Sequence, residues 1–454
     1  MARRARVLVV ALPVALALAG DLRGAAASTP DVFGLGSEAT ALAGAVTARA
    51  TDFSAAFYNP AGLSAGPGTR EVALGLTGYA SRLAVRGQRA RITDPLGFEL
   101  GVRLPVPLGG RLQGRVVLGL ALHMLPDQIV HIVAHTPEEA FFPYYDNRTQ
   151  RLLVLPAFGV RITRRLTLGV GFNFLAGLDG KVDASPGATR AIEPRVDEKL
   201  EATLKLHAGA RFEATDRLAL ALSYRQGFSV PFRTASVNRV AGLNIDINID
   251  AEGLFTPDEV WAGAALAATP RLMVSLDLGW LRWSAWRGPY VTVSSVLPIA
   301  GPFDVSPPVV PYDDIYSVRA GAEWRALEHP GWELRLRAGA GYEPSPLPDQ
   351  PGVTNLLDSD KIILAAGAGL LLPHLYAQPL RIDAHLMAHA LRDRTFVKQV
   401  YPTGATGCPA TNSVCGLHDE VADIPGTQIS NIGYPQITGG GSVWEAGITV
   451  TLSL

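Results

Sequence analysis

Residues 201–212 read EATLKLHAGARF, and this stretch decides the fold class. Its even-numbered positions are all apolar: Ala202, Leu204, Leu206, Ala208, Ala210 and Phe212. Its odd-numbered positions include Glu201, Lys205, His207 and Arg211. Successive side chains of a β-strand point to opposite sides, so a period of two predicts a strand with one apolar face and one polar face.

The same alternation recurs along the chain, for example in residues 98–104, 168–174 and 448–454. We expect about fourteen strands, an even number that leaves both chain ends on the periplasmic side of a membrane barrel. They lie near residues 70–82, 96–104, 112–123, 149–161, 166–177, 196–213, 217–237, 243–268, 271–284, 313–326, 332–343, 361–373, 380–391 and 442–454.

A soluble β-sandwich also has alternating strands, so the pattern alone does not separate the two folds. Two observations favour the membrane barrel. The polar faces carry many charges, as a wet lumen would, and tight turns such as 215–217 alternate with long connections such as 124–148. Short periplasmic turns and long outer loops are typical of outer-membrane proteins. The predicted fold class is therefore all-β, a transmembrane antiparallel β-barrel formed by residues 70–454.

The composition agrees with this fold and excludes other classes. The chain has 454 residues, a formal net charge of −1 and 48% hydrophobic residues. A near-neutral charge balance argues against a nucleic-acid partner, which favours a basic surface. No segment has the roughly 18 uninterrupted apolar residues that a spanning helix needs, so we expect no helix in the inner membrane.

Residues 1–27 have the pattern of a secretory signal peptide. Its parts are Arg3, Arg4 and Arg6, an apolar run over residues 7–19, and the small residues Ala25, Ala26 and Ala27. The apolar run is too short for a spanning helix. The pair Arg3-Arg4 suggests twin-arginine export as an alternative, but the residues that follow it fit the signal for that pathway poorly. We expect ordinary secretion and a location in the outer membrane of a Gram-negative cell.

Residues 28–69 do not alternate, being small and rich in turn formers. They include Asn59, Pro60 and Ala61. Pro60 fixes its own φ and disfavours the helical region for Asn59, whose side chain can bond nearby backbone, so the sequence predicts a defined turn. The segment could be a periplasmic tail, or a plug inside a lumen too wide for wall side chains to fill. We expect the plug, or hatch.

Several motifs along the chain carry a resemblance to one family. They are Gly34-Leu35-Gly36, Asn59-Pro60-Ala61, Leu222-Ser223-Tyr224-Arg225, the segment 277–284 (DLGWLRWS), the segment 341–349 (GYEPSPLPD) and Asp358-Ser359-Asp360. In this order they resemble the FadL/TodX-type outer-membrane transporters of long-chain fatty acids and aromatic hydrocarbons. The resemblance spans nearly the whole mature chain. The strand count above follows the family's pattern, so it is not independent of the resemblance.

The resemblance implies a fourteen-stranded barrel sealed by an N-terminal hatch. It also implies capture of a hydrophobic ligand, a fatty acid or hydrocarbon, by the outer loops, followed by internal binding and passive lateral release into the membrane. The expected partners are that ligand, outer-membrane lipid and the barrel assembly machinery, and the expected state is a monomer. The chain departs from the usual pattern at Leu454, where such barrels generally end in an aromatic residue.

Two sets of residues are candidates for ligand contact. The aromatic residues Phe141, Phe142, Tyr144 and Tyr145 lie in a long loop and are candidates for ligand capture, with local loop packing as the alternative. By strand parity, Arg103, Arg225, Arg319 and Arg381 face the lumen and could bind a substrate carboxylate. The alternative for each arginine is a cross-strand ion pair.

The remaining residues give little support to other functions. Cys408 and Cys415 share one long loop, and in an oxidising compartment we expect a disulfide rather than a metal pair, which would lack further ligands. His385 and His389 would lie about 13 Å apart on a strand, too far for one metal ion. The chain has no nucleophile-elbow motif, so we expect no enzyme, no cofactor and no metal. The main alternative is a general diffusion porin, which would lack a hatch.

Overall fold

The structure is a computed structural model that describes residues 30–92, 94, 96–124, 135, 139–146, 152–186, 192–240, 243–297, 301–305, 309–375, 378–399 and 433–454. The expected signal peptide and the pair Cys408 and Cys415 lie outside the described residues.

Fourteen antiparallel strands close into a barrel, which confirms the predicted fold class. The wall strands are β1 (Glu71–Val85), β3 (Leu96–Pro105), β4 (Val116–Met124), β5 (Leu153–Arg161), β6 (Leu166–Pro186), β7 (Ile192–Glu213), β8 (Leu218–Arg225), β11 (Asp258–Thr269), β12 (Leu272–Arg282), β15 (Ile315–His329), β16 (Trp332–Glu343), β17 (Lys361–Leu375), β18 (Gln378–Val397) and β19 (Gln436–Ser453). β19 pairs with β1 from Glu71↔Ser453 to Val85↔Gly439 and closes the ring. We call the end of the barrel where Arg70 and Leu454 exchange backbone hydrogen bonds the turn end, and the opposite end the loop end.

Two sides of the wall differ as the alternation predicts. On β12, Leu276 and Leu278 point outward and are 48% and 56% exposed, whereas Asp277 between them is fully buried in the lumen. Outward-facing leucine, valine and phenylalanine side chains recur on most wall strands. Such an apolar outer band is that of a transmembrane barrel of the outer-membrane type.

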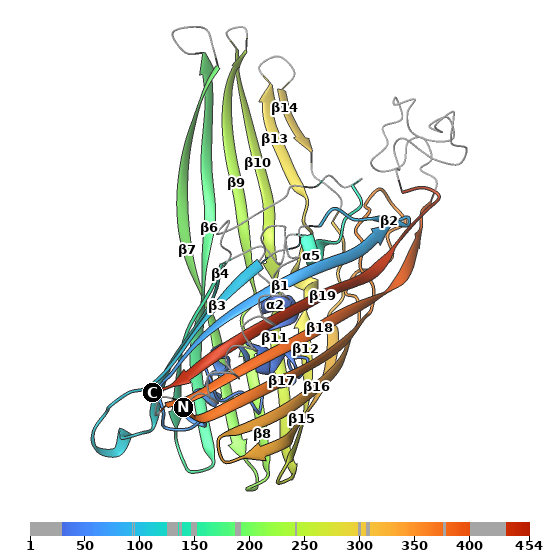
Figure 1. Cartoon of the computed structure of the whole chain (residues 1–454). Coiled ribbons are helices and arrows are strands. Elements are labelled where there is room, and N and C mark those ends of the chain that lie inside the picture. Colours follow the sequence, from blue (N-terminus) through green and yellow to red (C-terminus); the bar gives the residue numbers. More distant parts are fainter. Residues whose placement is uncertain are drawn as a thin grey trace, which may run out of the picture.

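Beyond the loop end, several strands continue as tall hairpins (Figure 1). The additional strands are β2 (Gln88–Arg89), β9 (Phe228–Val240), β10 (Leu243–Thr256), β13 (Val291–Leu297) and β14 (Gly301–Val305). Residues 178–195 and 285–312, which lie between expected strands, therefore contain paired strands. The expected strands 217–237 and 243–268 are each divided in two, into β8 and β9 and into β10 and β11. β6 and β7 stay in register out to Pro186↔Ile192, because the backbone ladder does not depend on which solvent surrounds it.

The N-terminal segment, residues 30–70, lies inside the barrel (Figure 1). It contains α2 (Pro30–Phe33), α3 (Ser37–Thr40), α4 (Ala55–Tyr58) and η1 (Pro60–Ser64). Three further short helices, η2 (Gly110–Leu112), α5 (Pro143–Asp146) and η3 (Trp283–Ala285), belong to connections between strands. In the described part of the chain, no helix is long and apolar enough to cross a membrane.

Candidate ligand-binding lumen

The turn at Asn59 fixes the N-terminal segment to the wall. Asn59 has extended backbone (φ −161°, ψ 105°) and Pro60 begins η1, the conformation that the sequence predicts. The fully buried Asn59 side chain accepts a hydrogen bond from the Ala61 amide (3.1 Å). Its Nδ2 donates to the carbonyl oxygens of Thr47 (3.0 Å) and of Ala210 in β7 (3.2 Å). One side chain thus joins two parts of the segment to the barrel.

Glycines on the lumen face let the segment approach the wall closely. A Cβ atom at Gly209 of β7 would collide with Oδ1 of Asn59. A Cβ atom at Gly339 of β16 would collide with the backbone of Leu42. The sequence analysis missed these positions. Both glycines lie on the polar, lumen-facing side of their strands, and a glycine at such a position could have indicated a close approach of backbone.

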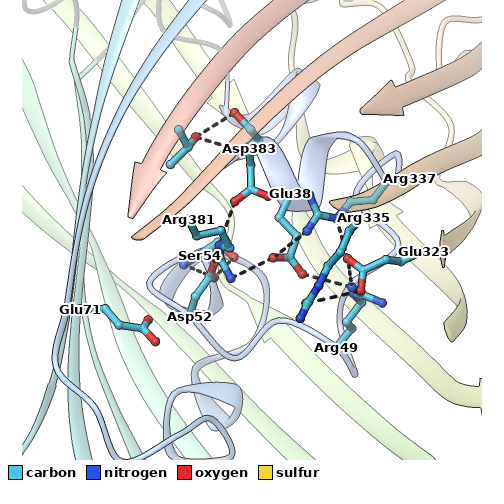
Figure 2. A network of polar contacts seen from close by, with 12 residues as sticks. Glu38, Arg49, Asp52, Ser54, Glu71, Glu323, Arg335, Arg337, Arg381 and Asp383 are labelled. Carbon is cyan, nitrogen blue, oxygen red and sulfur yellow. Dashed lines mark hydrogen bonds and ion pairs between the residues drawn. The ribbon is translucent and has the colours of Figure 1, made fainter. Parts of the chain in front are cut away.

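A partly buried ion network holds the segment at the opposite side of the lumen (Figure 2). Glu38 of α3 contacts Nη2 of Arg49 (3.2 Å), Nη2 of Arg337 (3.4 Å) and Nη1 of Arg381 (3.1 Å). Asp52 contacts Nη2 of Arg381 at 2.6 Å. Burial raises the pKa of Glu38, but the three guanidinium groups outweigh it and hold this pKa well below its usual range.

An aromatic cluster closes the lumen near the loop end. It consists of Phe33, Phe141, Phe142, Tyr144, Tyr145, Phe255, Trp283, Trp286, Tyr290 and Tyr312, all buried. The four aromatic residues that the sequence singled out for ligand capture lie together in it. Tyr144 packs on Trp283 with ring centroids 4.5 Å apart, and Trp286 stacks on Tyr312 at 4.6 Å. The arrangement offers flat apolar surfaces to a hydrophobic guest.

Lys361 is a lumen cation that sequence reasoning missed. Its Nζ lies 4.0 Å from the Tyr144 ring centroid, 3.5 Å from Glu343 and 3.4 Å from Asp358. The sequence could have indicated this position, because Lys361 and Ile363 are two residues apart on β17 and therefore point to the same side, and Ile363 faces the lumen. Both carboxylates already neutralise it, so it contributes no surplus positive charge.

Two of the four arginine candidates line one cavity between the aromatic cluster and the N-terminal segment. The cavity has a volume of about 30 Å³, and its charged or titratable lining is Asp31, His207, Arg225, Glu259, Arg319 and Glu343. Arg225 lies 2.6 Å from Glu259, and its guanidinium lies over the Phe57 ring at 4.2 Å. Arg319 lies 3.3 Å from Glu343 and over the Trp261 ring at 4.5 Å.

The other two arginines serve the N-terminal segment. Arg103 is fully buried and donates to the carbonyl oxygens of Leu63 (2.9 Å) and Thr69 (3.0 Å). Arg381 belongs to the ion network of Glu38 and Asp52. The structure therefore brings Arg225 and Arg319 together and keeps Arg103 and Arg381 apart from the cavity.

Comparison with solved structures identifies the architecture. A FadL homologue of Pseudomonas aeruginosa superposes with a TM-score of 0.55 at 12% identity, covering 95% of this chain and 98% of that one. The P. putida toluene transporter TodX gives 0.56 at 16% identity, covering 92% and 98%. This chain has the fold of the FadL/TodX-type channels.

A third channel of the same fold, the Ralstonia pickettii toluene transporter TbuX, gives a TM-score of 0.53 at 14% identity, covering 93% of this chain and 99% of that one. No protein-family model and no curated protein matches the sequence. At these identities, the likeness to the FadL/TodX-type channels concerns the fold.

Proposed function

We propose that the chain is an outer-membrane channel for the passive uptake of hydrophobic small molecules, either long-chain fatty acids or hydrocarbons. The observation that carries this proposal is the buried aromatic cluster, which lies directly above a lumen filled by the N-terminal segment. An apolar chamber at the loop end suits a ligand that leaves water. TodX and TbuX, two toluene transporters of the same fold, support the same class of ligand.

In this proposal Phe141, Phe142, Tyr144 and Tyr145 capture the ligand. They lie at the loop end and contact the deeper rings of Trp283 and Phe33 through Tyr144 and Tyr145. A ligand that moves inward from one aromatic ring to the next stays in contact with apolar surface at every step. Most of its own apolar surface therefore remains out of water.

The N-terminal segment acts as the hatch, so release is lateral. Hydrogen bonds from Asn59 to β7 and ion pairs from Glu38 and Asp52 to β16 and β18 span the lumen from side to side. A path along the barrel axis would require breaking these contacts. A ligand that passes through the wall reaches the membrane without crossing the aqueous exit.

The wall has one interruption that suits such an exit. The pairing of β5 with β6 is broken between Val154↔Phe174 and Ala157↔Gly171. Pro156 lies in this gap and has no N–H to donate to β6. On the lumen side of the gap, both polar atoms of the buried Asn173 side chain have no hydrogen-bond partner among the described residues. We place the lateral exit here.

The alternative function is that of a general diffusion porin. A conductance measurement distinguishes a porin from the proposed channel for hydrophobic molecules. The purified protein is placed in planar bilayers, and toluene entry is measured in proteoliposomes. We expect near-zero steady conductance together with protein-dependent toluene entry. A large, steady conductance would support the porin and contradict the proposal.

A further inference from the structure

The cavity beneath the aromatic cluster is lined by polar groups. A pure hydrocarbon would make no use of these groups when it binds. Val32 and Leu281 line the cavity and also belong to the apolar core that contains the aromatic cluster. Tyr58 and Phe57 of the N-terminal segment form part of its other side. The cavity is therefore a polar site between the aromatic cluster and the N-terminal segment.

Arginine N–H groups in this lining lack hydrogen-bond acceptors. Nε and Nη1 of Arg225 and Nε of Arg319 are buried and have no hydrogen-bond partner among the described residues. Nη1 of Arg225 is 3.8 Å from Asp31, which is an ion-pair distance but too long for a hydrogen bond. Arg225 itself is only 8% exposed. A buried guanidinium donor without an acceptor favours any oxygen that reaches it.

The charge of the lining disfavours an anionic oxygen. Two guanidinium groups face three carboxylates, those of Asp31, Glu259 and Glu343, so the lining has a formal charge of −1 with His207 neutral. A carboxylate that entered would lose its hydration beside these like charges. A neutral oxygen meets the same donors without that repulsion.

We infer that the cavity receives the oxygen of a neutral amphiphile, an alcohol or a carbonyl compound with an aromatic or aliphatic body. Its volume of about 30 Å³ accepts a group the size of a water molecule, which is the size of a hydroxyl group. The apolar body then lies toward Leu281 and the aromatic cluster. This inference rests on the proposed uptake of hydrophobic small molecules and extends the ligand class beyond fatty acids and hydrocarbons.

The test compares three ligands with the same ring: toluene, benzyl alcohol and benzoate. The full-length barrel is placed in nanodiscs, and binding is followed by tryptophan fluorescence against empty nanodiscs. We expect benzyl alcohol to bind about tenfold more tightly than toluene, as one hydrogen bond to a charged donor allows, and benzoate to bind most weakly. Equal binding of the alcohol and toluene, or tightest binding of benzoate, would overturn the inference.

Variants assign the preference to the cavity. The double variant R319M/E343Q removes one guanidinium together with its carboxylate partner, which avoids an unpaired buried charge. Because Nε and Nη1 of Arg225 remain in this variant, we expect it to reduce the tenfold preference for the alcohol only in part. Adding R225M/E259Q, which removes the second guanidinium with its carboxylate partner, should bring the two affinities close to each other. R325M, on the same strand but not in the cavity lining, is the matched control and should keep the preference. A combined variant R225M/E259Q/R319M/E343Q that keeps the full preference contradicts the inference.

The outcomes separate this inference from the proposed function. Toluene binding and entry without a preference for the alcohol would overturn the inference and support the proposed function. Absence of binding and entry for all three ligands would overturn both.

Discussion

Nδ2 of Asn59 donates a hydrogen bond to the carbonyl oxygen of Ala210, which lies 151 residues further along the chain in the wall that surrounds the segment. The donor belongs to the N-terminal segment and the acceptor to β7. Because the bond is made to backbone, it holds the segment at one height in the barrel whatever side chains surround it.

The first prediction concerns this contact. Replacing Asn59 and Pro60 by alanine should loosen the segment without preventing barrel assembly, because the buried amide bonds cost roughly 1–3 kcal/mol to lose and the wall ladder is untouched. Deleting residues 28–60 should go further and produce an ion-conducting barrel. Conductance in planar bilayers measures both effects, and hydrocarbon entry should fall in N59A/P60A. A deletion variant no more conductive than the full-length protein would show that the segment does not block the lumen.

The wall was predictable from the sequence because a closed sheet between lipid and lumen imposes a period of two on every strand. Leu276, Asp277 and Leu278 show this period directly in their exposure. The upper part of the β6–β7 hairpin and the β13–β14 hairpin were not predictable in the same way, whereas most of β9 and all of β10 fall within expected strands. Beyond the membrane both faces of a strand can contact water, so a period of two is not required there, although β10 keeps it over residues 243–250.

The partners of the lumen charges were not predictable. Parity placed Arg381 in the lumen, but its partner Asp52 is 329 residues away and in the segment that shows no periodicity. Barrel closure and the seating of the segment decide which charges meet. The sequence therefore indicated the residue types of the lumen and left their pairing open.

The second prediction concerns the ion network. Glu38 has a lowered pKa, so its stabilising contribution is fully present above the pKa of an unfolded glutamate, about 4.3, and is lost as the pH falls through the lower folded-state value. The wild-type barrel should therefore stay closed to ions until the pH is well below 4. E38Q should leak already at neutral pH, because Arg337 and Arg381 lose a partly buried carboxylate that both of them contact.

Conductance recorded from pH 7 down to pH 3 measures this difference. Glu328 lies at the turn end of β15 and makes a single exposed contact with Arg325, so E328Q is the control and should behave as wild type. Identical closure of E38Q and wild type at all pH values would show that the network does not hold the segment.

The third prediction concerns the loop that carries the aromatic candidates. His135 lies between Glu139 (Nδ1 to Oε2, 2.9 Å) and Asp146 (Nε2 to Oδ2, 2.8 Å), and its ring stacks on Phe141. Burial opposes protonation, but the bonds to both carboxylates outweigh it and raise the pKa of His135. A raised pKa stabilises the loop fully below about pH 6.5 and ceases to do so as the pH rises through the folded-state value.

Hydrogen exchange of residues 139–146, corrected for intrinsic rates, tests the loop. Protection of the Tyr145 and Asp146 amides, which donate to Phe142, should fall between acid and alkaline pH in the wild type. H135Q should remove the pH dependence, whereas H329Q, at the turn end of β15, should keep it. Protection that does not change with pH in the wild type would contradict the role given to His135.

The fourth prediction concerns the proposed exit at Pro156. Cysteines at Pro156 and Phe172, the positions that face each other across the gap in the β5–β6 ladder, would form a staple across it. Directly opposed residues of antiparallel strands have Cα atoms about 4.5–5.5 Å apart, a separation that a disulfide spans. The oxidised P156C/F172C barrel should bind hydrocarbon normally but fail to release it into the membrane. A reductant should restore release to the level of P156A/F172A, which likewise supplies the N–H that Pro156 lacks.

A second staple on the same strand pair separates exit from general rigidity. Phe158 and Val170 are register partners one step nearer the turn end, where the ladder is intact. The oxidised F158C/V170C barrel should therefore transport as wild type does. Both staples are made in a background with Cys408 and Cys415 changed to serine, so that only the introduced pair can oxidise. If P156C/F172C transports equally well when oxidised and reduced, the ligand leaves elsewhere. If both staples block transport, the whole β5–β6 seam must move, and the missing ladder contact at Pro156 is not the specific point of release.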